Sequence, residues 1–191
     1  MRPKNPATFT VRTSIIKRRQ SLGLLAHGDL EERFTRSRSE LEAAVAIALG
    51  GLAAEELFLG ETGTGPASDL ASATEVAAMM VGALGMAGSL VSYEAMAEGA
   101  FNAKNLVGRV LSDSDAKRKV EDILDRQRER VMACLEANRD LVMALRDALI
   151  ERDELIGEDI VAVIEEAIER RGTKPDLVIV ADAEEAAPSP D

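Results

Sequence analysis

The chain has 191 residues, a length typical of one domain or of one domain with tails. Hydrophobic residues make up 46% of the sequence, which excludes a globally disordered protein, and aromatic residues make up only 3%, so the core must be aliphatic. The formal net charge of −11 argues against nucleic acid as a partner of the main body, because contacts to phosphate need clustered cations.

Cysteine, histidine and apolar runs exclude further classes of protein. The single cysteine, Cys134, excludes an internal disulfide and disfavours a cysteine-rich zinc module. The single histidine, His27, excludes any site that needs two histidines from these residues, including the H-E-x-x-H motif of zinc proteases. The longest apolar run, Ala43–Leu49, is far shorter than the roughly 20 residues that cross a bilayer, and the basic start lacks the apolar core of a secretory signal. We therefore expect no membrane span and a cytoplasmic location.

The first part of the chain predicts a small β element. Residues 1–8 contain two prolines and are expected to form a flexible lead. Phe9–Ile16 and Ser21–Ala26 are short, apolar and rich in β-branched or aliphatic residues, which indicates a hairpin or ribbon. The basic residues Lys17–Arg19 lie between them, either as a solvated hairpin tip or as a contact to acidic lipid or a neighbouring subunit. His27–Asp29 then predicts a turn.

From Ser37 the apolar residues follow the period of a helix. Ser37 and Glu40 have the spacing of a capping box, so a first helix is expected to begin there and to end at Gly60. A compact loop, Gly60–Pro66, leads into a second helix that ends near Gly85. The loop lacks the lysine of a Walker A motif, so we interpret its glycines as turn residues.

The second half of the sequence predicts three more helices. Residues 86–112 are expected to form a long loop with at most one helical turn. Ser112–Asp115 opens a long helix, Asn138 is expected to cap the next, and Ile156–Asp159 begins a last helix with Ile160, Ile164 and Ile168 buried. Residues 173–191 are acidic and predicted to be disordered. The predicted fold is therefore mainly α with a small β-hairpin or ribbon near the start.

Three segments in this order carry a resemblance to a known family. They are Leu49–Leu57 (L-G-G-L-A-A-E-E-L), Thr64–Leu70 (T-G-P-A-S-D-L) and Leu155–Ile160 (L-I-G-E-D-I). The chain resembles the peptidase domain of FtsH-type proteins, the membrane-anchored AAA zinc metalloproteases. The resemblance covers roughly residues 9–170, and it defines an expected domain over residues 9–172.

The resemblance implies a fold, an activity and a metal. Members of this family form a hexameric ring of mostly helical peptidase domains under an ATPase ring, and they degrade protein substrates with ATP. Their zinc is held by the two histidines of H-E-x-x-H and by an aspartate further along, which matches Asp69. A glutamate near those histidines matches Glu55, so the resemblance implies that Glu55 lies beside the zinc ligands.

The sequence departs from the family pattern at the centre of its chemistry. The H-E-x-x-H motif would precede the segment that matches Phe9–Ile16, and Met1–Thr10 bears no trace of it. The ATPase domain and the membrane anchor are missing too, so ATP could act only through residues outside this sequence. Ser68 replaces the usual asparagine. Catalytic zinc needs three protein ligands and an open position for water, and one carboxylate will not hold it tightly. We therefore expect an incomplete domain with no peptidase activity of its own.

Alternative interpretations of these residues and of the whole chain stay open. Asp69 is also what a first helical turn favours near its positive end, and one member of the Glu55–Glu56 pair is expected to be a solvated acid. His27 is expected in an exposed loop and Cys134 as a packed thiol. The chain is either a shortened FtsH-like peptidase domain or a non-catalytic helical module that assembles with full-length relatives and regulates them. An unrelated acidic helical domain is the third alternative.

Overall fold

The computed structural model describes residues 10–16, 24–28, 35–95 and 105–173. Within them the chain is mainly helical with a small antiparallel sheet, which confirms the predicted fold class. Contacts divide the chain into two compact units, which we describe separately. The sheet unit comprises the described parts of residues 1–34 and 137–176, and the helical unit comprises those of residues 35–136.

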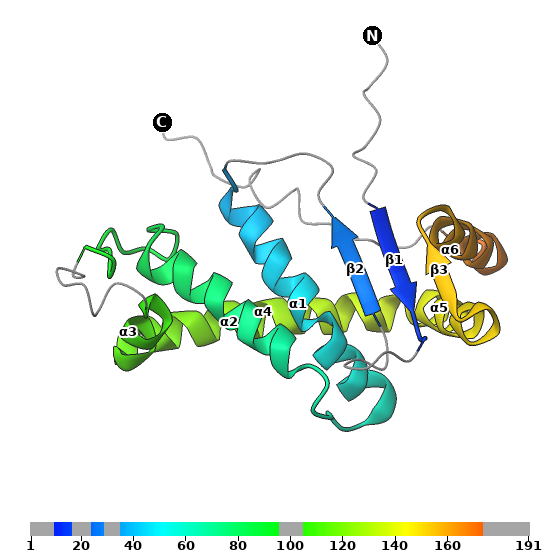
Figure 1. The fold of residues 1–191 in the computed structure, drawn as a ribbon, viewed down its shortest axis with the longest axis horizontal. Helices are drawn as coiled ribbons and strands as arrows, with labels where there is room; N and C mark the ends of the chain where they lie inside the picture. Colours follow the sequence, from blue (N-terminus) through cyan, green and yellow to red (C-terminus); the bar gives the residue numbers. More distant parts are fainter. Residues whose placement is uncertain (1–9, 17–23, 29–34, 96–104, 174–191) are drawn as a thin grey trace, which may run out of the picture. The chain divides into compact units, whose positions relative to one another are not determined.

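The sheet unit contains three strands in the order β2-β1-β3. The central strand β1 (Thr10–Ser14) pairs with β2 (Leu24–Gly28) on one side and with β3 (Glu154–Ile156) on the other, and both pairings are antiparallel (Figure 1). β1 and β2 correspond to the predicted hairpin or ribbon. The predicted turn at His27–Asp29 is wrong for its first two residues, because His27 lies opposite Val11 within the ladder and Gly28 ends β2.

Two helices complete the sheet unit. α5 (Arg139–Arg152) and α6 (Glu158–Arg171) enclose the side chain of Leu155, which is fully buried. The sequence predicts three buried isoleucines on α6, but its buried residues are Val163 and Ala167. Since Ile160, Ile164 and Ile168 are half-buried beside them, the buried stripe is displaced by part of a turn from the predicted one.

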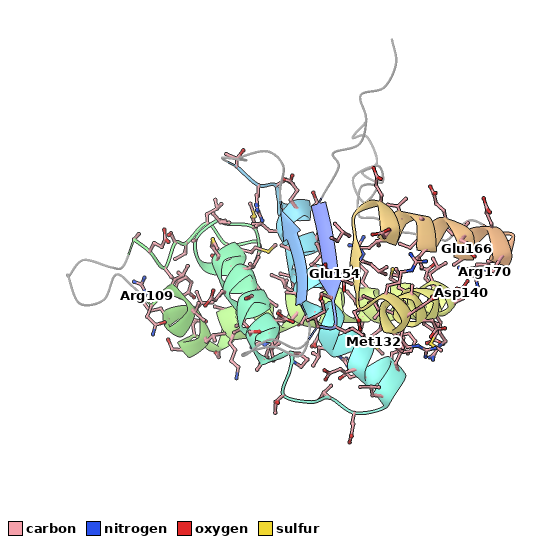
Figure 2. The ribbon with its side chains drawn as sticks, turned by 45° about the vertical axis from the view of Figure 1, so that its right-hand side comes forward. Arg109, Met132, Asp140, Glu154, Glu166 and Arg170 are labelled. Carbon is pink, nitrogen blue, oxygen red and sulfur yellow. The ribbon has the colours of Figure 1, made fainter. Side chains whose placement is uncertain are left out.

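Arg171 binds the residues at the start of α5, next to the last residue of α4 (Ser114–Ala137). Its Nη2 donates to the carbonyl oxygen of Ala137 at 3.1 Å, and its Nη1 donates to Asn138 Oδ1 at 3.3 Å and approaches Asp140 Oδ1 at 3.4 Å. Asp140 lies beside the end of α6 (Figure 2). Asn138 occupies the predicted N-cap position of α5, although its side chain makes no capping bond. It is buried and serves as an acceptor for Arg171 instead.

The helical unit begins with α1 (Arg38–Leu59), and the sequence predicts both of its ends correctly. Ser37 Oγ accepts from the Glu40 N–H at 3.3 Å, and Glu40 Oε2 accepts from the Ser37 N–H at 2.7 Å, which completes the capping box. The helix ends at Gly60, whose φ of 78° is in the left-handed region that glycine adopts without strain.

The core of the helical unit is formed by α1, α2 (Ala67–Gly82), α3 (Leu106–Ser112) and α4. α1 and α2 lie side by side (Figure 1). The buried side chains are aliphatic and mostly small: Leu41, Ala77, Ala78, Met80, Val81, Val110, Ala116, Val120 and Ile123. Small residues allow the helices to approach closely, so a core without large aromatic residues is filled.

α3 is the helix that the sequence does not predict. It lies within residues 86–112, which are expected to form a loop, and it includes Gly108, which disfavours helix. Asn105 Oδ1 accepts from the Gly108 N–H at 2.7 Å and so caps the start. Val110 is fully buried against α2. Tertiary burial and a local cap therefore outweigh a weak helical propensity.

Some of the predictions concern residues that the structure does not describe. The predicted flexible lead at residues 1–8, the basic segment Lys17–Arg19 and the predicted disordered tail lie wholly or almost wholly outside the described ranges. The domain boundaries at residues 9 and 172 therefore stay a prediction. Within the described residues, no helix is both long and apolar enough to cross a bilayer.

Candidate functional site

The loop Gly60–Pro66 connects the two helices that carry the predicted site residues. The Gly60 N–H donates to the carbonyl oxygen of Glu56 at 3.2 Å, which ends α1. Pro66 precedes α2, where its fixed φ favours the start of a helix and its missing N–H leaves no donor unsatisfied. Local signals therefore fix both ends of the loop, and Asp69 lies in the first helical turn that follows it.

Glu55 holds this loop from the side of α1. Its Oε2 accepts from the Gly63 N–H at 2.7 Å. A Cβ at Gly63 or Gly65 would lie 3.6 or 3.5 Å from the two carboxylate oxygens, so the loop passes close over the carboxylate. Hydrogen bonds with an ionised acceptor are stronger than neutral ones. Glu55 is thus a side chain that shapes the loop, a role compatible with its predicted place beside a metal ligand.

Glu56, the next residue, has a different partner. Arg128 on α4 donates from Nε and Nη2 to Glu56 Oε2, at 3.0 and 2.5 Å. The expectation that one acid of the pair is merely solvated is therefore wrong, because both are partly buried and both are bonded. Arg128 is the residue at this site that sequence reasoning missed.

Asp69 lies in the first turn of α2 and is exposed. Within the described part of the chain, its carboxylate makes no hydrogen bond and no ion pair. Its nearest feature on α1 is Gly51, where an added Cβ would lie 3.7 Å from Asp69 Oδ2. Because Gly51 has no side chain, the space beside the carboxylate stays open.

Two exposed apolar side chains lie near this space. Ile47 is one turn before Gly51 and therefore on the same face of α1, and its side chain is 56% exposed. Leu70 on α2, next to Asp69, is 43% exposed. The surroundings of the Asp69 carboxylate therefore combine the absent side chain of Gly51 with two exposed apolar residues.

The donor set does not fit zinc without additional ligands. A catalytic zinc site takes three protein ligands, with histidine nitrogen, cysteine sulfur and carboxylate oxygen as the usual donors. Among the residues that the structure describes, no group of three histidine, cysteine or acidic side chains is arranged to hold a metal ion. At this end of α2, Glu55 already accepts from Gly63, which leaves the carboxylate of Asp69 as the available donor.

The remaining predicted residues lie elsewhere. The backbone of His27 is part of β2 in the sheet unit. Cys134 is exposed on α4, so the expectation of a packed thiol is wrong. An open cavity of about 490 Å³ lies along α4 and is lined by Arg38, Met86, Ile123 and several charged residues, but it includes neither Asp69 nor Glu55.

Comparison with known proteins matches this chain to one family. Residues 5–163 match the model of peptidase family M41. The ATP-dependent zinc metalloprotease FtsH 2 of Symbiobacterium thermophilum is 37% identical over 150 residues, which are 78% of this chain and 25% of that protein. The ATP-dependent zinc metalloprotease FtsH 4 of Synechocystis sp. is 33% identical over 157 residues, again 78% and 25% of the two chains.

A third relative has a similar identity and a similar coverage. The ATP-dependent zinc metalloprotease FtsH 4 of Sphaerobacter thermophilus is 36% identical over 166 residues, 81% of this chain and 24% of that protein. The chain spans about a quarter of the length of these curated relatives. The match runs from before β1 into α6 and includes the Glu55–Asp69 region, so the chain belongs to peptidase family M41.

Proposed function

We propose that these residues are part of the peptidase domain of an ATP-dependent zinc metalloprotease, in which Asp69 is one zinc ligand. The observation that carries the proposal is the exposed carboxylate of Asp69, which has no partner in the described chain and lies beside Gly51. The two histidine ligands and the catalytic glutamate would come from residues outside this sequence, since it contains a single histidine.

The exposed face of α1 supports this proposal. A helix that carries two histidines four residues apart presents both on one face. Such a helix could pack against Ile47 and Gly51, where the missing side chain permits a close approach. Its histidines would then lie near Asp69. In this arrangement Glu55 holds the loop, and thereby the aspartate, in place.

The chain by itself is proposed to be inactive. One carboxylate cannot supply the three protein ligands of a catalytic zinc, and no step of catalysis can be assigned to the residues present. Cleavage of protein substrates, the use of ATP and assembly into a hexameric ring would belong to the larger protein. Cleavage of a protein substrate by the purified 191-residue chain with micromolar zinc would contradict this.

The first experiment is to measure the mass of the endogenous polypeptide with an antibody against residues 112–171. A band far above 20.4 kDa is expected, because the ligands that the proposal needs lie outside these residues. A band near 20.4 kDa would instead favour the alternative of a non-catalytic module that binds full-length relatives. Co-elution with such a relative in size exclusion would then be the direct test of that alternative.

The second experiment tests Asp69 in the longest natural polypeptide that contains it. Asp69→Asn is expected to lower zinc affinity by more than about 100-fold, since even supporting residues around a metal contribute about 10–100-fold. Glu75→Gln is the matched control, because Glu75 is another exposed acid on α2. The measurement is bound zinc per polypeptide. Equal zinc content in Asp69→Asn and the wild type would show that Asp69 is not a ligand.

A further inference from the structure

The Glu55–Glu56 pair lies at the unfavourable end of α1. The last turn of a helix carries partial negative charge, so acids are disfavoured there and cations are favoured. The last turn of α1 contains no basic residue. Two adjacent acids at this end conflict with the local preference of the helix, and such a conflict points to a role outside the helix itself.

Each acid of the pair finds its compensating donor in a different element. Glu56 accepts from the side of the Arg128 guanidinium, with Nε at 3.0 Å and Nη2 at 2.5 Å. Arg128 belongs to α4, 72 residues along the chain. Glu55 accepts from the loop, through the Gly63 N–H at 2.7 Å. One acid therefore ties α1 to α4, and its neighbour ties α1 to the loop.

These two contacts form a continuous connection to Asp69. Glu55 and Glu56 are consecutive in one helical turn, so the contact of Glu56 with Arg128 and the contact of Glu55 with the loop act on the same turn of α1. The loop held by Glu55 then runs from Gly63 to Pro66, whose carbonyl oxygen accepts from the Leu70 N–H at 2.9 Å in the first turn of α2. Asp69 belongs to that same turn.

We propose that Arg128 is a positioning residue for Asp69. By holding Glu56, it sets the last turn of α1 so that Glu55 meets the Gly63 N–H, and the loop then places the carboxylate of Asp69 beside Gly51. The consequence for zinc rests on the proposed function. The positioning itself is a property of this chain and is testable without metal or activity.

The contribution of Arg128 is to orientation rather than to stability. Its side chain is 41% exposed and that of Glu56 is 28% exposed. Ion pairs with this much solvent contribute little to the free energy of unfolding. A variant of Arg128 is therefore expected to leave the thermal midpoint nearly unchanged while it loosens the loop, and these two readouts separate positioning from general destabilisation.

The test is the exchange rate of the Gly63 amide, measured by NMR on the metal-free chain. Arg128→Met is expected to speed this exchange by up to about fivefold, because the loss of a partly exposed ion pair cannot change the opening of the loop by more than the pair itself contributes. Glu55→Gln weakens the acceptor itself, so its effect on the exchange rate is the reference for the effect of Arg128→Met. Arg126→Met is the matched control, because Arg126 is an exposed cation on α4 whose Nε donates to the backbone carbonyl oxygen of Asp122 in its own helix at 3.2 Å.

Two further variants distinguish loss of the ion pair from general destabilisation of the fold. Arg128→Lys retains the charge and is expected to restore part of the protection, and the exchange of charges in Glu56→Arg with Arg128→Glu is expected to restore more. If Glu55→Gln speeds exchange and Arg128→Met does not, Glu55 holds the loop alone and the proposal fails. It also fails if neither variant changes the rate. Loss of zinc binding in Asp69→Asn is a separate result, so the proposed function can fail while this inference stands.

Discussion

The two ends of α2 differ in whether the acidic side chain beside them is hydrogen-bonded. At the closed end, formed by Gly82, Tyr93, Val110 and Asp113, the Asp113 carboxylate and the Tyr93 N–H are both hydrogen-bonded to neighbouring elements. Asp113 Oδ1 accepts from the N–H groups of the first turn of α4, both at 2.9 Å, and its carboxylate accepts from the Tyr93 hydroxyl. The Tyr93 N–H donates to the carbonyl oxygen of Gly82 at 2.8 Å, and Val110 fills the space beside that glycine.

The open end is formed by Gly51, Glu55, the loop Gly60–Pro66 and Asp69. Its aspartate occupies a first helical turn as an acid should, but within the described residues it bonds to nothing. The attraction of a helix N-terminus for an acid amounts to about 0.3–1 kcal/mol, which explains why an acid is tolerated here but not why it is left exposed. The difference between the two ends indicates that Asp113 serves its own helix, whereas Asp69 is available to something outside.

The largest expected effect is at the closed end, with Gly82→Ala. The added Cβ would lie 2.3 Å from Val110 Cγ2, a contact that the buried junction of α2 and α3 must move to relieve. Overpacking at the upper end of its usual range costs about 3 kcal/mol. Alanine favours helix over glycine by about 1 kcal/mol, which offsets part of this cost. We therefore expect a net loss of about 2 kcal/mol in the free energy of unfolding.

Urea unfolding measures this loss, and two further variants make it specific. Gly50→Ala is the control, because nothing lies within 4 Å of a Cβ at that position. Val110→Ala combined with Gly82→Ala removes the clashing methyl group and should show that the two changes are not additive. A Gly82→Ala variant as stable as the wild type would mean that the closed end is less tightly packed than described.

The next prediction is an increase in the free energy of unfolding, caused by a substitution at the open end. Gly51→Ala is expected to raise the free energy of unfolding by up to about 1 kcal/mol, because alanine favours helix over glycine. The added Cβ would lie 3.7 Å from Asp69 Oδ2, an ordinary contact. Urea unfolding beside Gly50→Ala is the measurement. A loss of stability with Gly51→Ala alone would mean that this face of α1 is already covered in the isolated chain.

Local chemistry makes the open end predictable from sequence. The Ser37 and Glu40 pair begins α1, Gly60 ends it, and Pro66 begins α2, and all three signals act within a few residues. Because helix starts and stops depend on such short-range bonds, the helices on either side of the loop and the place of Asp69 follow from the pattern. The role of Asp69 as a metal ligand does not follow from this pattern, because it is implied by the family resemblance.

Contacts between distant residues explain what the sequence does not predict. β3 is three residues long and exists because it pairs with β1, which precedes it by most of the chain. α3 depends on the burial of Val110 against α2. Arg128 meets Glu56 across 72 residues, and nothing in the pattern of α4 distinguishes it from the other exposed or half-exposed cations of that helix. Pairings of this kind are properties of the tertiary structure, so periodicity cannot reveal them.

The smallest effect concerns pH and belongs to Asp113 at the closed end. The N–H of Ala116 and the Tyr93 hydroxyl lower the pKa of Asp113 in the folded chain. Asp113 therefore contributes stability at pH values above its unfolded pKa of about 3.9, and this contribution is lost as the pH falls through the lower folded pKa. Asp113→Asn should differ from the wild type in unfolding midpoint at pH 7 and converge with it on acidification. A difference in midpoint that persists at low pH would mean that the charge of the Asp113 carboxylate does not stabilise the start of α4.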